Sequence, residues 1–126
     1  MKNNGNKVTL STKQLESIIA LYNSGRLREA VTAIKALNQE YPNVPLLFNL
    51  LGACYKSLGQ IGGALQMFKT ATKINPDYAE AYFNLGVIQQ QLIQSDSAII
   101  SYIKAIELIS NYPDAHNNLG ILYLDV

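Results

Sequence analysis

The chain has 126 residues, and ten Lys and Arg against nine Asp and Glu give it a formal net charge of +1. This balance gives no reason to expect a nucleic-acid partner, which needs a basic stripe, or a polybasic membrane anchor. The single cysteine, Cys54, excludes a disulfide within the chain and a metal site built on paired cysteines, and it fits the reducing cytoplasm best.

The first predicted segment, 1–10, is a flexible N-terminal leader. It is polar, rich in Asn and Lys, and lacks the apolar run of a signal peptide. No apolar stretch of the sequence approaches the length that crosses a bilayer, so no membrane partner is expected.

Apolar residues that recur every three or four positions predict seven helices after this leader. Ser11 and Gln14 have the spacing of a capping box at the start of the first helix, and Asp77 and Glu80 have it near the start of the fifth. Pro42 ends the second helix, because the residue before a proline avoids the helical region. In chain order, the predicted helices span about 11–23, 27–40, 45–57, 61–74, 79–91, 96–109 and 113–125.

The helices are organised in a repeat, since Gly52, Gly86 and Gly120 follow one another at intervals of 34 residues. A small residue at this position allows two helices to cross closely. Gly25 and Gly59 share another phase and are expected in left-handed turns, which glycine adopts at little cost. Further sets in the same register are Ala30, Ala64 and Ala98; Ile34, Phe68 and Tyr102; and Pro42 and Pro76.

This pattern of large, small and proline positions resembles the tetratricopeptide repeat family. The second repeat carries the full set, whereas the third departs at Gln89 and Ser110, and the first has Ser17 and Ile18 where a large and then a small residue are usual. The resemblance implies an all-α, right-handed superhelical solenoid of antiparallel helix pairs. The repeats implied are 11–44, 45–78 and 79–112, with a half repeat at 113–126.

The resemblance also implies where a partner binds. The first helix of each repeat lines the concave face of such solenoids, so a protein or an extended peptide is expected there. This groove is apolar and amide-bearing, with Lys56 as its basic residue. The candidate partner-binding residues are Asn49, Leu50, Ala53, Phe83, Asn84, Val87, Gln90, Asn117 and Asn118.

Chaperone-binding members of this family hold a C-terminal carboxylate in a clamp of Lys, Asn, Asn, Lys and Arg. Placing that clamp on this chain yields Asn49, Ala53, Asn84, Asp114 and Asn118. Only the middle Asn matches, and the charge of Asp114 has the wrong sign. The comparison therefore disfavours capture of a chaperone tail.

A second resemblance is closer. The run Ala-Xaa-Xaa-Asn-Leu-Gly, at 81–86 and again at 115–120, is similar to the repeats of the O-linked N-acetylglucosamine transferase family. There, Asn at this position forms a ladder that grips a peptide backbone, which implies that role for Asn84 and Asn118. Leu50 interrupts the ladder in the second repeat. The alternative is that Asn is simply common at this position of the repeat.

No residue pattern indicates catalysis. His116 is the only histidine and is expected to pack, because a catalytic base needs an orienting partner. Cys54 is expected to be a small, partly buried side chain. The acidic residues have no metal-ligand spacing, and the sequence lacks a phosphate-binding loop. We therefore expect no enzyme activity, cofactor or metal.

The predicted function is a protein-interaction scaffold, with RNA binding disfavoured because the groove lacks basic residues. The alternative is a non-catalytic targeting arm of a larger glycosyltransferase- or sulfotransferase-type enzyme. The last helix carries an apolar run at 119 and 121–124, which a longer array, a partner or a second copy of the chain would cover. Self-association through this helix is therefore a further expectation.

Overall fold

The computed structural model describes residues 9–125 and contains seven α-helices in that part of the chain. Each helix begins and ends within one residue of its predicted bounds, so the predicted elements are confirmed. The helices are α1 (Thr12–Asn23), α2 (Leu27–Glu40), α3 (Pro45–Ser57), α4 (Ile61–Ile74), α5 (Ala79–Gln91), α6 (Ser95–Leu108) and α7 (Pro113–Asp125).

Most of the predicted leader, residues 1–8, lies outside the described residues. Leu10, near its end, is partly buried and packs against the first core cluster. None of the described helices combines the length and the hydropathy needed to cross a membrane.

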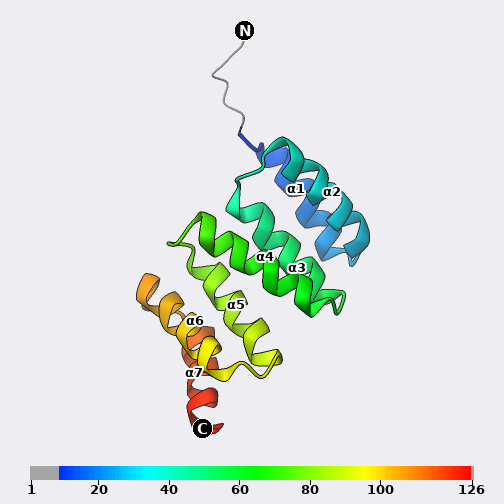
Figure 1. Ribbon diagram of the computed structural model, residues 1–126. Helices are drawn as coiled ribbons and strands as arrows, with labels where there is room; N and C mark the ends of the chain where they lie inside the picture. The colour runs from blue at the N-terminus through cyan, green and yellow to red at the C-terminus, as the bar shows by residue number, and fades with distance from the viewer. Residues whose placement is uncertain (1–8, 126) are drawn as a thin grey trace.

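The helices form an all-α stack in which each packs mainly on its neighbours in sequence, most extensively α3 on α4 and α5 on α6. Figure 1 shows this succession running from α1 and α2 at one end of the molecule to α7 at the other. Because α3 and α5 also touch, the first helices of the second and third repeats lie side by side. This nearest-neighbour packing is that of a helix-pair solenoid, as predicted.

Two of the repeat glycines stand where helices cross. A Cβ atom on Gly52 would lie 2.6 Å from a ring carbon of Phe68, and one on Gly86 would lie 2.7 Å from a ring carbon of Tyr102. Both rings are buried. The predicted close approach is therefore confirmed for the second and third repeats.

The turn within each repeat has a residue with positive φ. Gly25 and Gly59 both have φ of +79°, as predicted, and Ile93 has φ of +59° at the same position of the third repeat. Ile93 is 83% exposed, so no packing around its side chain compensates for this backbone conformation.

One of the two predicted capping boxes forms. Ser11 Oγ accepts from the backbone N–H of Gln14 at 3.1 Å, and the Gln14 side chain accepts in return from the N–H of Ser11. The prediction for Asp77 is wrong, because α5 is capped at Tyr78 without a side-chain hydrogen bond. The Asp77 N–H instead donates to Oδ1 of Asn75 at 3.0 Å, which turns the chain before the helix begins.

Candidate partner-binding face

The nine predicted partner-binding residues lie on three successive first helices, α3, α5 and α7, and we call their common surface the first-helix face. Seven of them are half-buried and so combine a fixed position with some exposed surface. Asn117 is exposed, and Asn49 is buried with 4% of its surface exposed. The half-buried residues are Leu50, Ala53, Phe83, Asn84, Val87, Gln90 and Asn118.

The first connection across this face joins Asn49 on α3 to Asn84 on α5. Nδ2 of Asn84 donates to Oδ1 of Asn49 over 3.0 Å. Asn49 also acts on Tyr78, where it opposes the rise in the pKa of the phenol. Because Asn49 is buried, little of it remains for a partner, and its hydrogen bond with Asn84 orients the Asn84 amide.

The second connection passes through Tyr102 of α6, which is fully buried. The Tyr102 hydroxyl donates to Oε1 of Gln90 at 2.8 Å, and Nδ2 of Asn118 donates to that hydroxyl oxygen at 3.3 Å. Burial raises the pKa of Tyr102, and the hydrogen bond from Asn118 opposes the shift. The sequence marked Tyr102 as a core position but did not indicate its role as a bridge between α5 and α7.

An aromatic cluster supports the same part of the face. The Phe83 ring is stacked on Tyr112, with centroids 5.2 Å apart, and is tilted against Tyr102 at 5.8 Å. Tyr112 was not among the predicted residues, although it follows Tyr78 by one 34-residue repeat. Such aromatic pairs are rigid, so Phe83 is held in place at the face.

The electrostatic character changes from one end of the helices to the other. Burial and then the Glu80 carboxylate raise the pKa of Tyr78 to about 12. Burial, Glu80 and Asp114 also raise the pKa of Tyr112. The starts of α5 and α7 therefore bring two carboxylates close to two phenols.

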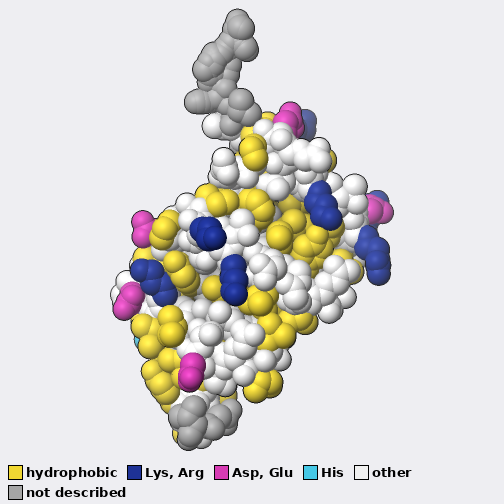
Figure 2. Space-filling model, in the orientation of Figure 1, with side chains coloured by type: hydrophobic (Ala, Val, Ile, Leu, Met, Phe, Trp, Pro, Cys, Tyr) yellow, Lys and Arg dark blue, Asp and Glu magenta, His cyan; other side chains and the backbone are white. Residues whose placement is uncertain are grey.

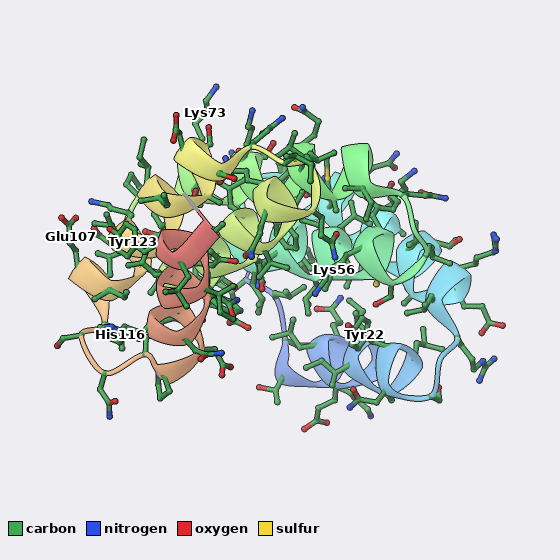
Figure 3. The ribbon with its side chains drawn as sticks, turned by 90° about the horizontal axis from the view of Figure 1, so that it is seen from below. Tyr22, Lys56, Lys73, Glu107, His116 and Tyr123 are labelled. Atoms are coloured by element: carbon green, nitrogen blue, oxygen red, sulfur yellow. The ribbon has the colours of Figure 1, made fainter. Side chains whose placement is uncertain are left out.

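The opposite end of the first helices carries an exposed cation. Lys56 is exposed near the end of α3, and beside it Ser57 Oγ lies 3.4 Å from the hydroxyl of Tyr22 on α1. Figure 3 shows Tyr22 on α1 and Lys56 on one side of the view, with His116 and Tyr123 of α7 on the other. On the side shown in Figure 2, basic side chains are spread apart and do not form a stripe.

Cys54 and His116, for which no catalytic role is expected, have different environments. Cys54 is more completely buried than predicted, and its burial raises the pKa of the thiol. The prediction that His116 packs is wrong: the side chain is exposed, with Nε2 2.9 Å from the Ser110 carbonyl oxygen. No described helix follows α7 to cover this position. Among the described residues, no group of three His, Cys, Asp or Glu side chains could hold a metal.

The last helix carries the apolar side chains that its sequence predicted would need cover, but only some of them are exposed. Leu122 is buried, and Leu119 packs beside it against α6. Ile121, Tyr123 and Leu124 are exposed, with Leu124 86% accessible. Self-association through this surface stays a prediction.

Sequence comparison identifies the repeats directly. Residues 52–92 and 94–126 match the model of a family described as TPR repeat, which together is more than half of the chain. Protein FlbA of Caulobacter vibrioides is 31% identical over 65 residues, which are 52% of this chain and 11% of FlbA. The chain therefore matches about a tenth of the length of that relative.

Solved structures share the fold. The first TPR of Spaghetti (RPAP3), bound to an HSP90 peptide, has a TM-score of 0.86 at 23% identity, covering 95% of this chain and 98% of that one. The Yersinia enterocolitica secretion chaperone SycD, in complex with a YopD peptide, has a TM-score of 0.84 at 21% identity, with coverages of 95% and 98%. MamA has a TM-score of 0.80 at 24% identity, covering 94% of this chain and 66% of MamA.

Proposed function

This chain belongs to the TPR repeat family, and on that premise we propose that it binds another protein by holding an extended peptide segment on the first-helix face. Two structural neighbours were solved with peptides, which supports a peptide as the ligand. The observation that carries the proposal is the arrangement of Asn84 and Asn118, which occupy the same position in successive repeats.

Each of these two amides is oriented by a hydrogen bond from its own nitrogen. Asn84 donates to Asn49, and Asn118 donates to Tyr102. The carbonyl oxygen of each amide has no hydrogen-bond partner within the described residues, and each nitrogen keeps a second N–H. A carboxamide held in this way can accept from a peptide N–H and donate to a peptide carbonyl. The pair therefore suits the backbone of an extended chain.

Apolar side chains of α3 and α5 on the same face supply contact area. Leu50, Ala53 and Val87 are half-buried, so a peptide side chain that covers them removes apolar surface from water. Phe83 is already fixed by its aromatic neighbours, so its part in such a contact costs little conformational entropy.

The charges of the face favour a neutral or basic segment. Glu80 and Asp114 are exposed at the starts of α5 and α7, and Lys56 is the basic residue among the groove positions. An acidic peptide end would meet two carboxylates there, which disfavours its binding. The peptide SRMEEVD, which the first TPR of Spaghetti binds, should therefore bind this chain poorly.

The proposal is tested by selecting peptides from a display library on the intact chain and measuring their affinity by fluorescence anisotropy. Asn84→Ala and Asn118→Ala should each weaken the selected peptides by about fivefold, the effect of a hydrogen bond worth about 1 kcal/mol. Asn43→Ala, an exposed change in the loop before α3, is the matched control and should leave affinity unchanged. Selected peptides that bind both Asn variants as tightly as the parent chain would rule out the amide pair.

A further inference from the structure

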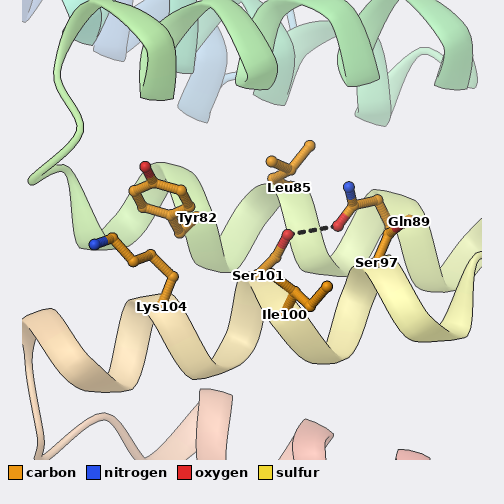
Figure 4. Close-up of a pocket in the computed structure, with 7 residues that line it drawn as sticks. All are labelled: Tyr82, Leu85, Gln89, Ser97, Ile100, Ser101 and Lys104. Atoms are coloured by element: carbon orange, nitrogen blue, oxygen red, sulfur yellow. Dashed lines mark hydrogen bonds between the residues drawn. The ribbon is translucent and has the colours of Figure 1, made fainter.

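A pocket of about 350 Å³ lies between α5 and α6, and its lining residues are labelled in Figure 4. Its volume is within the range of small-ligand sites. None of its lining residues belongs to the first-helix face, so it is a separate feature of the same repeat. The residues that define its chemistry are Tyr82, Gln89, Ile100, Ser101 and Lys104.

The pocket arises where the third repeat departs from the second. Gln89 and Ser101 stand one repeat after Tyr55 and Met67, two larger side chains that pack against the first core cluster. Glutamine in place of tyrosine is a narrower side chain, and serine in place of methionine is a shorter one. The two changes lie on facing helices. They leave a buried, hydrogen-bonded polar pair where the second repeat has two side chains packed against its core.

That polar pair is well defined. Gln89 and Ser101 are 6% and 5% exposed, and Ser101 Oγ donates to Oε1 of Gln89 at 2.6 Å. The Gln89 nitrogen has no hydrogen-bond partner within the described part of the chain, and Figure 4 shows it directed away from Ser101. The hydrogen bond between Gln89 and Ser101 therefore fixes one end of the pocket, while the Gln89 nitrogen keeps some contact with solvent.

The other end of the pocket carries a cation. Lys104 is half-buried and forms no ion pair within the described residues, and in Figure 4 it extends toward Tyr82 at the end opposite Gln89. No acidic side chain lines the pocket. A lysine in a pocket with no acidic side chain can offer its charge to an anion, and the apolar walls of the pocket strengthen that attraction.

The wall between these two ends is apolar. Leu85 is buried, and Ile100 is 68% exposed where the earlier repeats have Gln66 and Thr32 at the same position. An exposed isoleucine beside a pocket offers apolar surface that a ligand can cover. The pocket therefore has Lys104 at one end, the apolar wall in the middle and Gln89 at the other end.

We propose that this pocket binds a small, elongated monocarboxylic acid, with its carboxylate at Lys104 and its apolar body against Leu85 and Ile100. This site is independent of the peptide-binding face, because the two share no residue. This proposal gives a function to Gln89 and Ser101, which replace the Tyr55 and Met67 of the second repeat. Peptide binding on the first-helix face does not require these replacements.

The probe is 4-phenylbutanoate, compared with 4-phenylbutanamide, which has the same body without the charge. Binding to the full chain is followed by the backbone amide signals of α5 and α6 in NMR titrations. The acid should shift these signals and bind more tightly than the amide. Lys104→Gln should weaken the acid about tenfold and leave the amide unchanged, because the lost contact is a charge-assisted hydrogen bond.

Lys69→Gln is the matched control, since it removes the same charge from an exposed position on α4 outside the pocket. Ser101→Met restores the methionine of the second repeat and should abolish binding of both probes. Ile100→Gln tests the apolar wall independently, because this exposed side chain can change without loss of folding. It should weaken both probes several-fold.

The proposal is overturned if the acid shifts no signal of α5 or α6, or if it binds no better than the amide. It is equally overturned if folded Ser101→Met or Ile100→Gln protein binds the acid as the parent does. We expect the Asn84→Ala variant to bind the selected peptides more weakly and the acid unchanged, which would separate the two sites.

Discussion

Ile93 occupies the turn position that Gly59 fills one repeat earlier, and both residues have positive φ, +59° and +79°. For an L-residue with a β-branched side chain this conformation is strained. The hydrogen bonds around the two turns are the same: Gln60 N–H donates to Tyr55 O, and Gln94 N–H to Gln89 O, both at 2.8 Å. The repeat architecture therefore imposes the turn geometry on a residue that disfavours it.

Replacing Ile93 with glycine should stabilise the protein by about 1 kcal/mol, because glycine adopts the left-handed conformation without the steric cost. Little packing is lost, since Ile93 is largely exposed. Urea unfolding followed by circular dichroism measures the change. The reciprocal variant Gly59→Ala should be less stable than the parent, although a Cβ there meets nothing within 4 Å, so the loss reports φ alone. A destabilised Ile93→Gly protein would contradict this account.

Alanine at Gly86 and at Gly120 should have opposite effects, although both glycines hold the same repeat position. At Gly86 the new methyl group would lie 2.7 Å from the buried Tyr102 ring, and we expect a loss of about 1–3 kcal/mol. At Gly120 nothing lies within 4 Å, so alanine should stabilise α7 by about 0.5–1 kcal/mol through helix propensity. Thermal unfolding of the two single variants checks the signs, and a shift in the same direction for both would be incompatible with the described crossing.

The protein should lose stability as the pH rises from 10 toward 12. The folded-state pKa of Tyr78 is raised from its ordinary value of 10.0 to about 12, chiefly by burial and then by Glu80. The phenol of Tyr78 loses its proton at a lower pH in the unfolded chain than in the folded protein. Between pH 10 and 12 the unfolded state is therefore stabilised relative to the folded state. Below pH 10 the phenol is neutral in both states, and the folded protein keeps its full stability. Urea midpoints across the interval measure the loss, and Tyr78→Phe should reduce it without removing it, because Tyr102 and Tyr112 have pKa values raised in the same direction. An unchanged loss in Tyr78→Phe would show that Tyr78 is not its source.

Cys54 should react with thiol reagents only when the protein opens. Its side chain is 1% exposed, and burial raises its pKa, so both access and thiolate content are low in the folded state. The rate of alkylation should rise steeply within the urea transition and follow the population of open molecules. Rapid alkylation in native buffer would contradict the buried position. Because Cys54 lies in the first core cluster, the same measurement reports the opening of that part of the stack.

The sequence by itself determined the helices, their pairing and the crossing glycines. These features depend on contacts between residues three or four apart and on one 34-residue register, both of which can be read from the chain. The capping box predicted at Asp77 does not form, although Asp77 and Glu80 have the correct spacing. The Asp77 N–H donates to the Asn75 side chain instead. This alternative hydrogen bond depends on the geometry of the turn, which the spacing of residues does not specify.

Tertiary structure decided which amides are free. Asn49 and Asn84 have the same side chain and both occupy groove positions, yet one is buried and orients the other across 35 residues of sequence. The α5–α6 pocket has the same origin, since it requires Gln89 and Ser101 to face each other from two helices. Periodicity assigns each residue to a face of its own helix. The burial, hydrogen-bond partner and charge environment of that residue depend on the side chains that the neighbouring helices bring to it, and these exist only after the helices have packed.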